Sequence, residues 1–178
     1  MLFRTMTVAI LALLAACSSD PAPVEPDPTP TTTTSTPSIP VPTMPAQASE
    51  DSPEGAAAFV AHYVDVFNYA AATGDVEELS NLSSPDCKGC QSYIDLYRDT
   101  YAAGGYFKGG DWEIGKLKLK LGGTETYATT DVTSGGARFR TNKDAQEKTS
   151  ATATTKLTFA VRRSARGAQI TQLALGDA

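Results

Sequence analysis

Two cysteines, Cys87 and Cys90, stand three residues apart in the stretch SSPDCKGCQSYIDLY, residues 83–97. Thiols in this C-x-x-C spacing can form a disulfide, exchange electrons with another dithiol, or supply two ligands of a metal site. Positions three apart on a helical turn have Cα atoms about 5 Å apart, inside the range of about 4.4–6.8 Å that a disulfide spans. The spacing therefore fits a structural disulfide at the start of a helix.

A redox site is the alternative for the same pair. A helix N-terminus and the neighbouring Lys88 would both favour a thiolate, whereas Asp86 beside Cys87 would disfavour it. No strand pattern leads into the motif, as a thioredoxin-like site requires, and Pro85 is the last proline, so no later cis-proline can face the cysteines. The residues favour a structural disulfide, and redox exchange stays as the alternative.

A metal site is not expected. A closed zinc site needs four ligands, and apart from Cys17 the soft ligands are Cys87, Cys90 and His62. His62 follows the apolar stripe of a predicted helix by one position, which is typical of a partly exposed surface histidine. We expect neither a metal nor a cofactor.

Catalytic residues are equally hard to assign. The sequence has no G-x-S-x-G, P-loop, H-E-x-x-H or EF-hand pattern. An isomerase- or hydratase-like enzyme would need an ionisable group facing a buried pocket. Asp65, Tyr127 and Asp131 are the available groups, and none has a partner at a fixed spacing. We expect no catalytic residue and interpret the acids as solvated.

Aromatic residues give the chain one candidate pocket. Tyr93, Tyr97 and Tyr101 recur every four residues, so they share one face of a helix. The first interpretation is that they pack this helix on a sheet with their hydroxyls at its rim. The second is that, with the aromatic residues of GGYFKGGDW, they line the mouth of a pocket for an apolar or sugar ligand. The predicted rim comprises Tyr93, Tyr97, Tyr101 and Trp112.

The elements that would position these residues begin with three helices. Ser52 or Asp51 caps the first, Pro53 stands at its first turn, and Gly74 ends it. A short second helix follows Asp75. A third, opened by Ser84 or Asp86, carries Cys90 and the tyrosines and stops at Gly104-Gly105.

The remainder has the two-residue period of strands. In DWEIGKLKLKLGG the residues Leu117, Leu119 and Leu121 should face inward, and a bulge at Gly115 would bring Trp112 and Ile114 to the same face. Further strands are expected at 124–133, with an extension at 137–140, and around Leu157, Phe159 and Val161. A last strand follows a turn at 165–167. Helices followed by strands predict an α+β class.

The N-terminus predicts export. Residues 7–16 form an apolar run that is too short to span a bilayer, and Leu14-Ala15-Ala16-Cys17 resembles the bacterial lipobox. The resemblance implies that residues 1–16 are a lipoprotein signal peptide and that Cys17 receives acyl chains, which anchor the chain at the outer face of the bacterial cytoplasmic membrane. Disulfides persist in that compartment.

A tether is expected between the anchor and the fold. Residues 17–51 contain nine of the eleven prolines and no aromatic residue, a composition that predicts a disordered, extended spacer. The domain should then span residues 52–178. From Glu50 onward the chain has 14 Lys and Arg against 17 Asp and Glu, which argues against nucleic acid and against a basic lipid-binding patch.

Several stretches carry a resemblance to a known family. The lipobox, the Thr/Pro tether, FNYAAATGD (67–75), LSSPDCKGC (82–90) and GGYFKGGDW (104–112) resemble those of uncharacterised actinobacterial lipoproteins with a domain of unknown function. The element order resembles the ketosteroid-isomerase-like, or nuclear-transport-factor-2-like, cone. The resemblance implies three helices packed on a curved antiparallel sheet of about four strands, and it implies no activity.

These observations together favour a membrane-anchored, extracytoplasmic lipoprotein whose domain is a non-catalytic module. Its partner would be a small apolar ligand or an envelope protein. An extracytoplasmic enzyme that uses the cone pocket, or a C-x-x-C redox protein, is the alternative.

Overall fold

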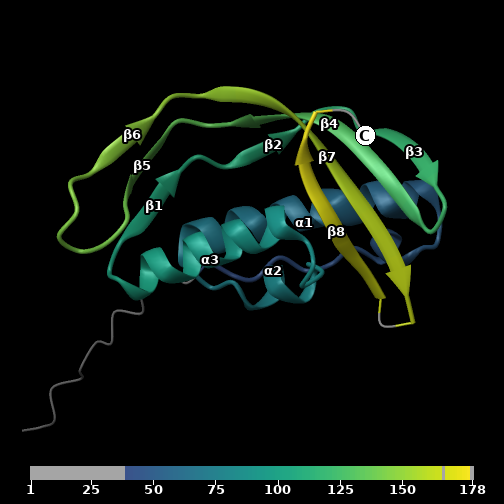
Figure 1. Ribbon diagram of the computed structural model, residues 1–178, viewed down its shortest axis with the longest axis horizontal. Helices are drawn as coiled ribbons and strands as arrows, with labels where there is room; N and C mark the ends of the chain where they lie inside the picture. The colour runs from purple at the N-terminus through teal and green to yellow at the C-terminus, as the bar shows by residue number, and fades with distance from the viewer. Residues whose placement is uncertain (1–38, 166, 177–178) are drawn as a thin grey trace, which may run out of the picture. The chain divides into compact units, whose positions relative to one another are not determined.

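The computed structural model of this protein describes residues 39–165 and 167–176. The helices precede the strands along this part of the chain (Figure 1). They are the 3-10 helix η1 (Ala46–Ser49) and the α-helices α1 (Pro53–Thr73), α2 (Glu77–Asn81) and α3 (Lys88–Ala102). The predicted α+β class is confirmed. The predicted signal peptide, Cys17 and the tether up to residue 38 lie outside the described residues.

The strands form two antiparallel sheets. The smaller sheet has the order β1-β5-β6 and consists of β1 (Tyr106–Gly109), β5 (Ala137–Arg140) and β6 (Lys148–Ser150). In the larger sheet β4 (Glu125–Ser134) pairs with β7 (Ala153–Ser164), which pairs with β8 (Gly167–Leu175). Along the other edge of β4 lie β2 (Trp112–Ile114) and β3 (Lys118–Gly122).

The predicted number of about four strands is wrong, because the described residues contain eight. The expected extension at 137–140 is a strand of the smaller sheet, and the polar run 141–149 leads into β6, where no strand was expected. Backbone hydrogen bonds hold such short strands without any apolar alternation in their sequence, so periodicity gives no sign of β6.

Helix α1 is the central element of the core. The Ser52 hydroxyl accepts a hydrogen bond from the Gly55 N–H at 2.9 Å, and Gly74 closes the helix in the left-handed conformation at φ 77°. Both ends agree with the prediction. In Figure 1 the helix lies along one side of the larger sheet. Phe59, Phe67 and Phe159 are buried between them, and burial of each such side chain contributes about 1.5–3 kcal/mol.

The segment before α1 also packs on the fold. Ala48 of η1 is 1% exposed, and its carbonyl accepts a hydrogen bond from the Arg163 guanidinium of β7 at 3.1 Å. Packed structure therefore begins ahead of Ser52, within the range predicted as tether.

The irregularity predicted at Gly115 is present. Ile114 pairs with Val132 and Lys118 with Thr129, so four steps along β2–β3 match three along β4. The one extra residue places Ile114 and Leu119 on the same face of the sheet, as expected of a bulge.

The predicted burial of the leucines in and next to β3 is only partly correct. Leu117 packs against the core, but Leu119 and Leu121 are 38% and 70% exposed. Leu119 pairs with the fully buried Ala128, so it does lie on the helix-facing side. It stays exposed because β3 is an edge strand, where the helix covers the sheet less completely.

The histidine prediction is wrong. His62 is only 2% exposed, and its Nε2 has no hydrogen-bond partner among the described residues. Burial lowers its pKa, although the nearby carboxylates of Asp65 and Glu78 act in the opposite direction. Helix α1 is covered by η1 and α2 as well as by the sheet, so its buried surface is wider than one stripe.

No helix in residues 39–165 or 167–176 combines the length and hydropathy that a membrane crossing requires.

Candidate functional site

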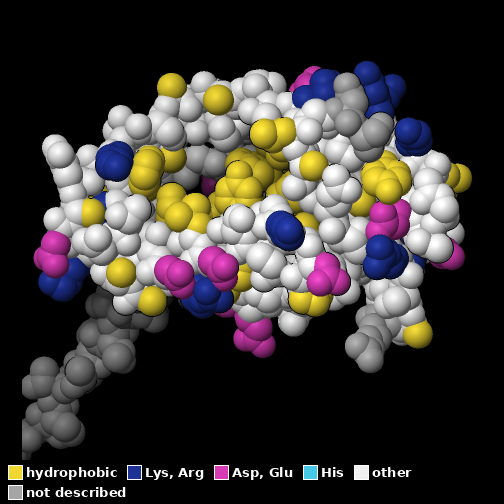
Figure 2. All heavy atoms as spheres, viewed as in Figure 1, with side chains coloured by type: hydrophobic (Ala, Val, Ile, Leu, Met, Phe, Trp, Pro, Cys, Tyr) yellow, Lys and Arg dark blue, Asp and Glu magenta, His cyan; other side chains and the backbone are white. Residues whose placement is uncertain are grey.

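A pocket of about 180 Å³ opens between α3 and the strands. Figure 2 shows hydrophobic side chains gathered in a hollow between the region of α3 and the strands above it. Five elements contribute to the lining, namely α3, β2, β4, β7 and β8. The lining residues are Tyr93, Trp112, Val132, Ser134, Thr155, Leu157 and Leu175.

The position of Trp112 is fixed from two sides. Asn68, in the C-terminal half of α1, donates its Nδ2 to the Trp112 carbonyl at 2.9 Å and accepts the Trp112 N–H at Oδ1 at 2.8 Å. The indole stacks on the Phe67 ring, with centroids 4.0 Å apart and planes at 27°. Helix α1 therefore holds both the backbone and the ring of this pocket residue.

Tyr93 forms the adjacent wall. Its ring meets Trp112 edge-to-face at 84°, with centroids 5.4 Å apart, and it meets Phe67 at 4.9 Å. Such contacts between aromatic rings contribute about 0.5–1.5 kcal/mol beyond area burial. Burial raises the pKa of the Tyr93 hydroxyl, so it remains protonated and can donate a hydrogen bond at neutral pH.

Two of the four predicted rim residues lie elsewhere. Tyr97 is 6% exposed and packs behind the pocket against Phe67 and Phe107. Tyr101 donates its hydroxyl to the Ala71 carbonyl at 2.8 Å and thereby joins α3 to the end of α1. Tyr93 and Trp112 remain at the pocket, and the predicted rim is corrected to these two.

The pocket lacks the groups that acid–base catalysis uses. Its lining includes no carboxylate and no imidazole, and Tyr93 is its one ionisable residue. Asp65 is exposed on α1, and Asp131 points to the opposite face of the sheet, where Lys156 lies 3.3 Å away. Tyr127 donates its hydroxyl to Glu125. None of these three residues lines the pocket.

Sequence reasoning did not find Asn68 or the residues from β4, β7 and β8. Asn68 gives a weak local signal, because asparagine is unfavourable inside a helix and needs a reason to be there. The strand residues give none, since they come together only through long-range pairing.

A larger cleft of about 420 Å³ lies at the start of α1. Its charged groups already have partners. Arg163 lies 3.7 Å from Asp51, and Glu125 accepts hydrogen bonds from Arg162 and Thr171 at 2.6 and 2.8 Å. Because its charged groups are paired within the chain, this cleft offers a ligand less than the aromatic pocket does.

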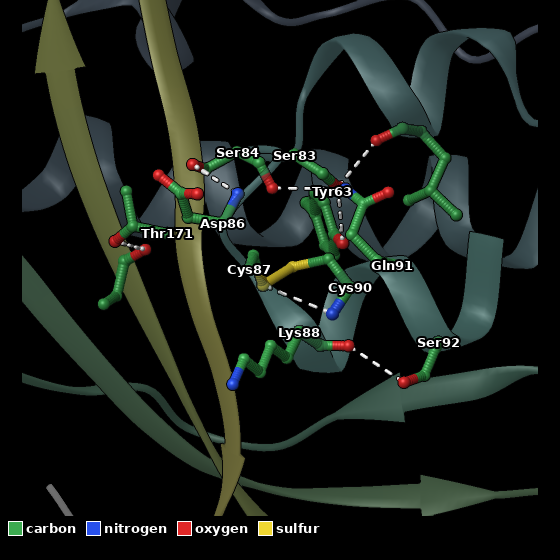
Figure 3. The surroundings of a disulfide bond; sticks show 12 residues. Tyr63, Ser83, Ser84, Asp86, Cys87, Lys88, Cys90, Gln91, Ser92 and Thr171 are labelled. Carbon is green, nitrogen blue, oxygen red and sulfur yellow. Dashed lines mark hydrogen bonds between the residues drawn. A yellow bond between two sulfur atoms is a disulfide. The ribbon is translucent and has the colours of Figure 1, made fainter. Parts of the chain in front are cut away.

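Cys87 and Cys90 form a disulfide at the start of α3 (Figure 3). Cys87 is the N-cap residue, and its sulfur accepts the Cys90 N–H at 3.2 Å. Both cysteines are 1% exposed, so a partner thiol has no direct access to either sulfur. A buried bond of this kind is typical of a structural role and not of redox exchange.

The glycine between the cysteines explains why the motif packs so closely. A Cβ on Gly89 would lie 2.2 Å from the Leu173 carbonyl oxygen of β8. Helix α3 therefore approaches the sheet at a position that only glycine fits. Around it, the Tyr63 hydroxyl lies 3.0 Å from the Ser83 Oγ, and the Cys87 N–H donates to the Ser84 carbonyl at 3.0 Å.

Metal ligands do not gather anywhere in the described part of the chain: no group of three or more His, Cys, Asp and Glu residues is close enough to hold an ion. His62, the remaining soft ligand of the predicted domain, is buried on α1.

Comparison with known proteins gives one family. The sequence profile of a family of unknown function, DUF6318, matches residues 29–167. No curated protein sequence matches the chain.

Solved structures show similarity in fold. The intermembrane space region of the chloroplast protein ARC6 is 14% identical, with 72% of this chain and 99% of that chain covered at a TM-score of 0.52. Kfla4162 from Kribbella flavida is 11% identical, with 68% and 90% covered and a TM-score of 0.47. An NTF2-like family protein from Streptomyces avermitilis is 16% identical, with 71% and 100% covered and a TM-score of 0.43.

Proposed function

The chain belongs to the DUF6318 family, which has no known function, and from the chemistry of its aromatic pocket we propose that it is a ligand-binding lipoprotein. Its acylated Cys17 anchors it at the outer face of the bacterial cytoplasmic membrane, and its cone-like domain binds a small, flat, largely apolar molecule. The observation that carries the proposal is the Trp112 side chain, which α1 holds in place at a pocket that residues 39–165 and 167–176 leave open.

The lining indicates the chemistry of the ligand. Tyr93 and Trp112 offer aromatic surfaces, and Val132, Leu157 and Leu175 add aliphatic ones. A volume of about 180 Å³ is close to that of a cavity of about 150 Å³ that accepts benzene, so one ring with small substituents fits. The hydroxyls of the lining residues can orient a single polar substituent.

The same lining supports binding in preference to catalysis. A general acid or base acts within hydrogen-bond reach of its substrate and with a pKa near the working pH. The side chains around this pocket provide neither a carboxylate nor an imidazole. Redox exchange through Cys87 and Cys90 has less support than binding, because both sulfurs are buried.

The anchoring part of the proposal depends on the leader and on Cys17. The apolar run and the Leu-Ala-Ala-Cys sequence before residue 18 support it. The paired cysteines agree with an oxidising compartment, where such bonds persist. Mass spectrometry of the mature protein tests it, since acylated Cys17 as the first residue is expected, and an intact leader would contradict the anchor.

Trp112 is the chain's one tryptophan, so its fluorescence reports on the pocket directly. We expect phenol to change the Trp112 emission in a saturable manner and glucose to leave it unchanged. Tyr93→Ala should weaken phenol binding about fivefold, since it removes an aromatic wall worth about 1 kcal/mol. Tyr69→Ala is the matched control, because Tyr69 bonds to Asp75 away from the pocket. An emission that responds to no aromatic probe would refute the proposed function.

A further inference from the structure

The outer face of the smaller sheet carries most of its positive charge. In the β1–β5 ladder Tyr106 pairs with Arg140 and Lys108 with Arg138, and directly paired residues share a face. Phe107 and Phe139 occupy the other face, where Phe107 contacts Tyr97 of α3 with ring centroids 5.3 Å apart. The four residues of the outward face are called the cationic face: Tyr106, Lys108, Arg138 and Arg140.

The charges of the cationic face are poorly compensated within the chain. Lys108 and Arg138 stand directly opposite each other, and like charges in such a pair are destabilising. Glu147 is 4.0 Å from Arg138 and accepts the Tyr106 hydroxyl. In the described residues neither Lys108 nor Arg140 has a carboxylate within 4.0 Å.

The environment of Tyr106 and Arg140 shows the same excess of positive charge. Lys108 Nζ and Arg140 Cζ lie 4.8 and 5.0 Å from the centre of the Tyr106 ring, so one aromatic ring interacts with two cations. The Arg140 Nε is buried and, within the described chain, has no acceptor. These cations are arranged side by side without enough acids to neutralise them, which is the arrangement that an external anion would stabilise.

We propose that the cationic face docks on the anionic phospholipid headgroups of the membrane. The cations lie along one face of a β-ladder, which suits an extended charged surface better than a single small anion. Tyrosine is also enriched at membrane–water interfaces. Proximity to the membrane rests on the proposed function, in which Cys17 carries lipid. Twenty-one residues separate Cys17 from Ile39, so the domain stays within about 75 Å of its anchor.

The cationic face differs from the expectation based on net charge. Residues from Glu50 onward are acidic in sum, yet strand pairing places three cations on one small face. The net charge of the sequence does not reveal which side chains share a face of the sheet, because β1 and β5 are about thirty residues apart along the chain.

The test uses the chain from Cys17 onward with Cys17→Ser, so that no lipid contributes. It is sedimented at low salt with vesicles of equal parts phosphatidylglycerol and phosphatidylcholine, and with vesicles of phosphatidylcholine alone. Each cation near an anionic surface contributes a factor of about five, so K108Q/R138Q/R140Q should lower partitioning about a hundredfold. The control K116Q/K118Q/K120Q removes the same charge around the edge strand β3 and should lower it far less.

Each outcome decides the proposal. Equal losses in both triple variants, or equal partitioning to both vesicle types, would overturn it. Release by inorganic phosphate beyond that by chloride at the same ionic strength would indicate a discrete phosphate site and would also overturn it. Circular dichroism checks folding, and if the first triple variant unfolds, Lys108→Gln alone should lower partitioning about fivefold.

The experiment separates this proposal from the proposed function. If the unacylated chain binds vesicles while Cys17 proves to be unmodified in cells, the role of the cationic face is supported and the lipid anchor is refuted. Loss of the phenol response at Trp112 would bear on the pocket alone.

Discussion

Gly89→Ala is the substitution that most sharply separates local propensity from packing. Gly89 lies in the first turn of α3, between the two cysteines of the disulfide. In an isolated helix this change stabilises by about 1 kcal/mol, since glycine is about that much less favourable than alanine. In this protein we expect Gly89→Ala to lower the free energy of unfolding instead.

The expected magnitude follows from the contact with β8. The new Cβ would lie 2.2 Å from the Leu173 carbonyl oxygen and 3.3 Å from its Cβ. Relief requires α3 and β8 to separate by about 1 Å, because the first of these atoms is backbone and cannot rotate away. Overpacking of this kind costs about 1–3 kcal/mol. Taking about 3 kcal/mol for the overpacking and subtracting about 1 kcal/mol for the gain in helix propensity, we expect the free energy of unfolding to fall by about 2 kcal/mol.

Urea denaturation followed by circular dichroism measures the free energy of unfolding. Ser92→Ala, at an exposed position one turn along α3, is the control and should change it by less than about 0.5 kcal/mol. A Gly89→Ala protein as stable as the parent, or more stable, would refute the close approach of α3 to the sheet.

Three further variants test other parts of the structure. Cys87→Ala with Cys90→Ala should lower the free energy of unfolding by about 2 kcal/mol, because the loop that the disulfide closes is short, and loss of folding in calorimetry would contradict a local role. Asn68→Ala removes both hydrogen bonds to the Trp112 backbone, each worth about 1 kcal/mol, and should shift the Trp112 emission to longer wavelength; an unchanged spectrum would contradict its positioning role. Burial lowers the pKa of His62 in the folded state. As the pH falls, the His62 imidazole is therefore protonated in the unfolded chain before it is protonated in the folded one, and the free energy of unfolding decreases as the pH drops below about 6.5. His62→Leu should therefore flatten the dependence of the melting temperature on pH between about pH 7 and 5. An unchanged dependence would mean that other titratable groups cause it.

Features set by neighbours in the sequence were predicted well. Ser52, Pro53 and Gly74 mark the ends of α1 through hydrogen bonds and backbone geometry that involve only the adjacent turn. The extra residue near Gly115 was also predictable, because the apolar residues change parity there. In each case the physical cause lies within a few residues of the feature.

Features set by distant neighbours were not predictable. Leu119 and Leu121 have a core-like alternation but lie on an edge strand, where coverage depends on how far the helix extends. The burial of His62 depends on α2 and on the segment before α1. The pocket residues of β4, β7 and β8 meet Trp112 only after the larger sheet has formed, so no short stretch of the chain specifies them.

The most direct test of the ligand-binding pocket is a nuclear Overhauser measurement between phenol and the labelled protein. We predict cross-peaks from the phenol ring protons to the Trp112 indole and to the methyl groups of Leu157 and Leu175, which line the pocket together. Cross-peaks confined to the exposed Leu119 and Leu121 would show nonspecific contact with the sheet edge and would contradict the account.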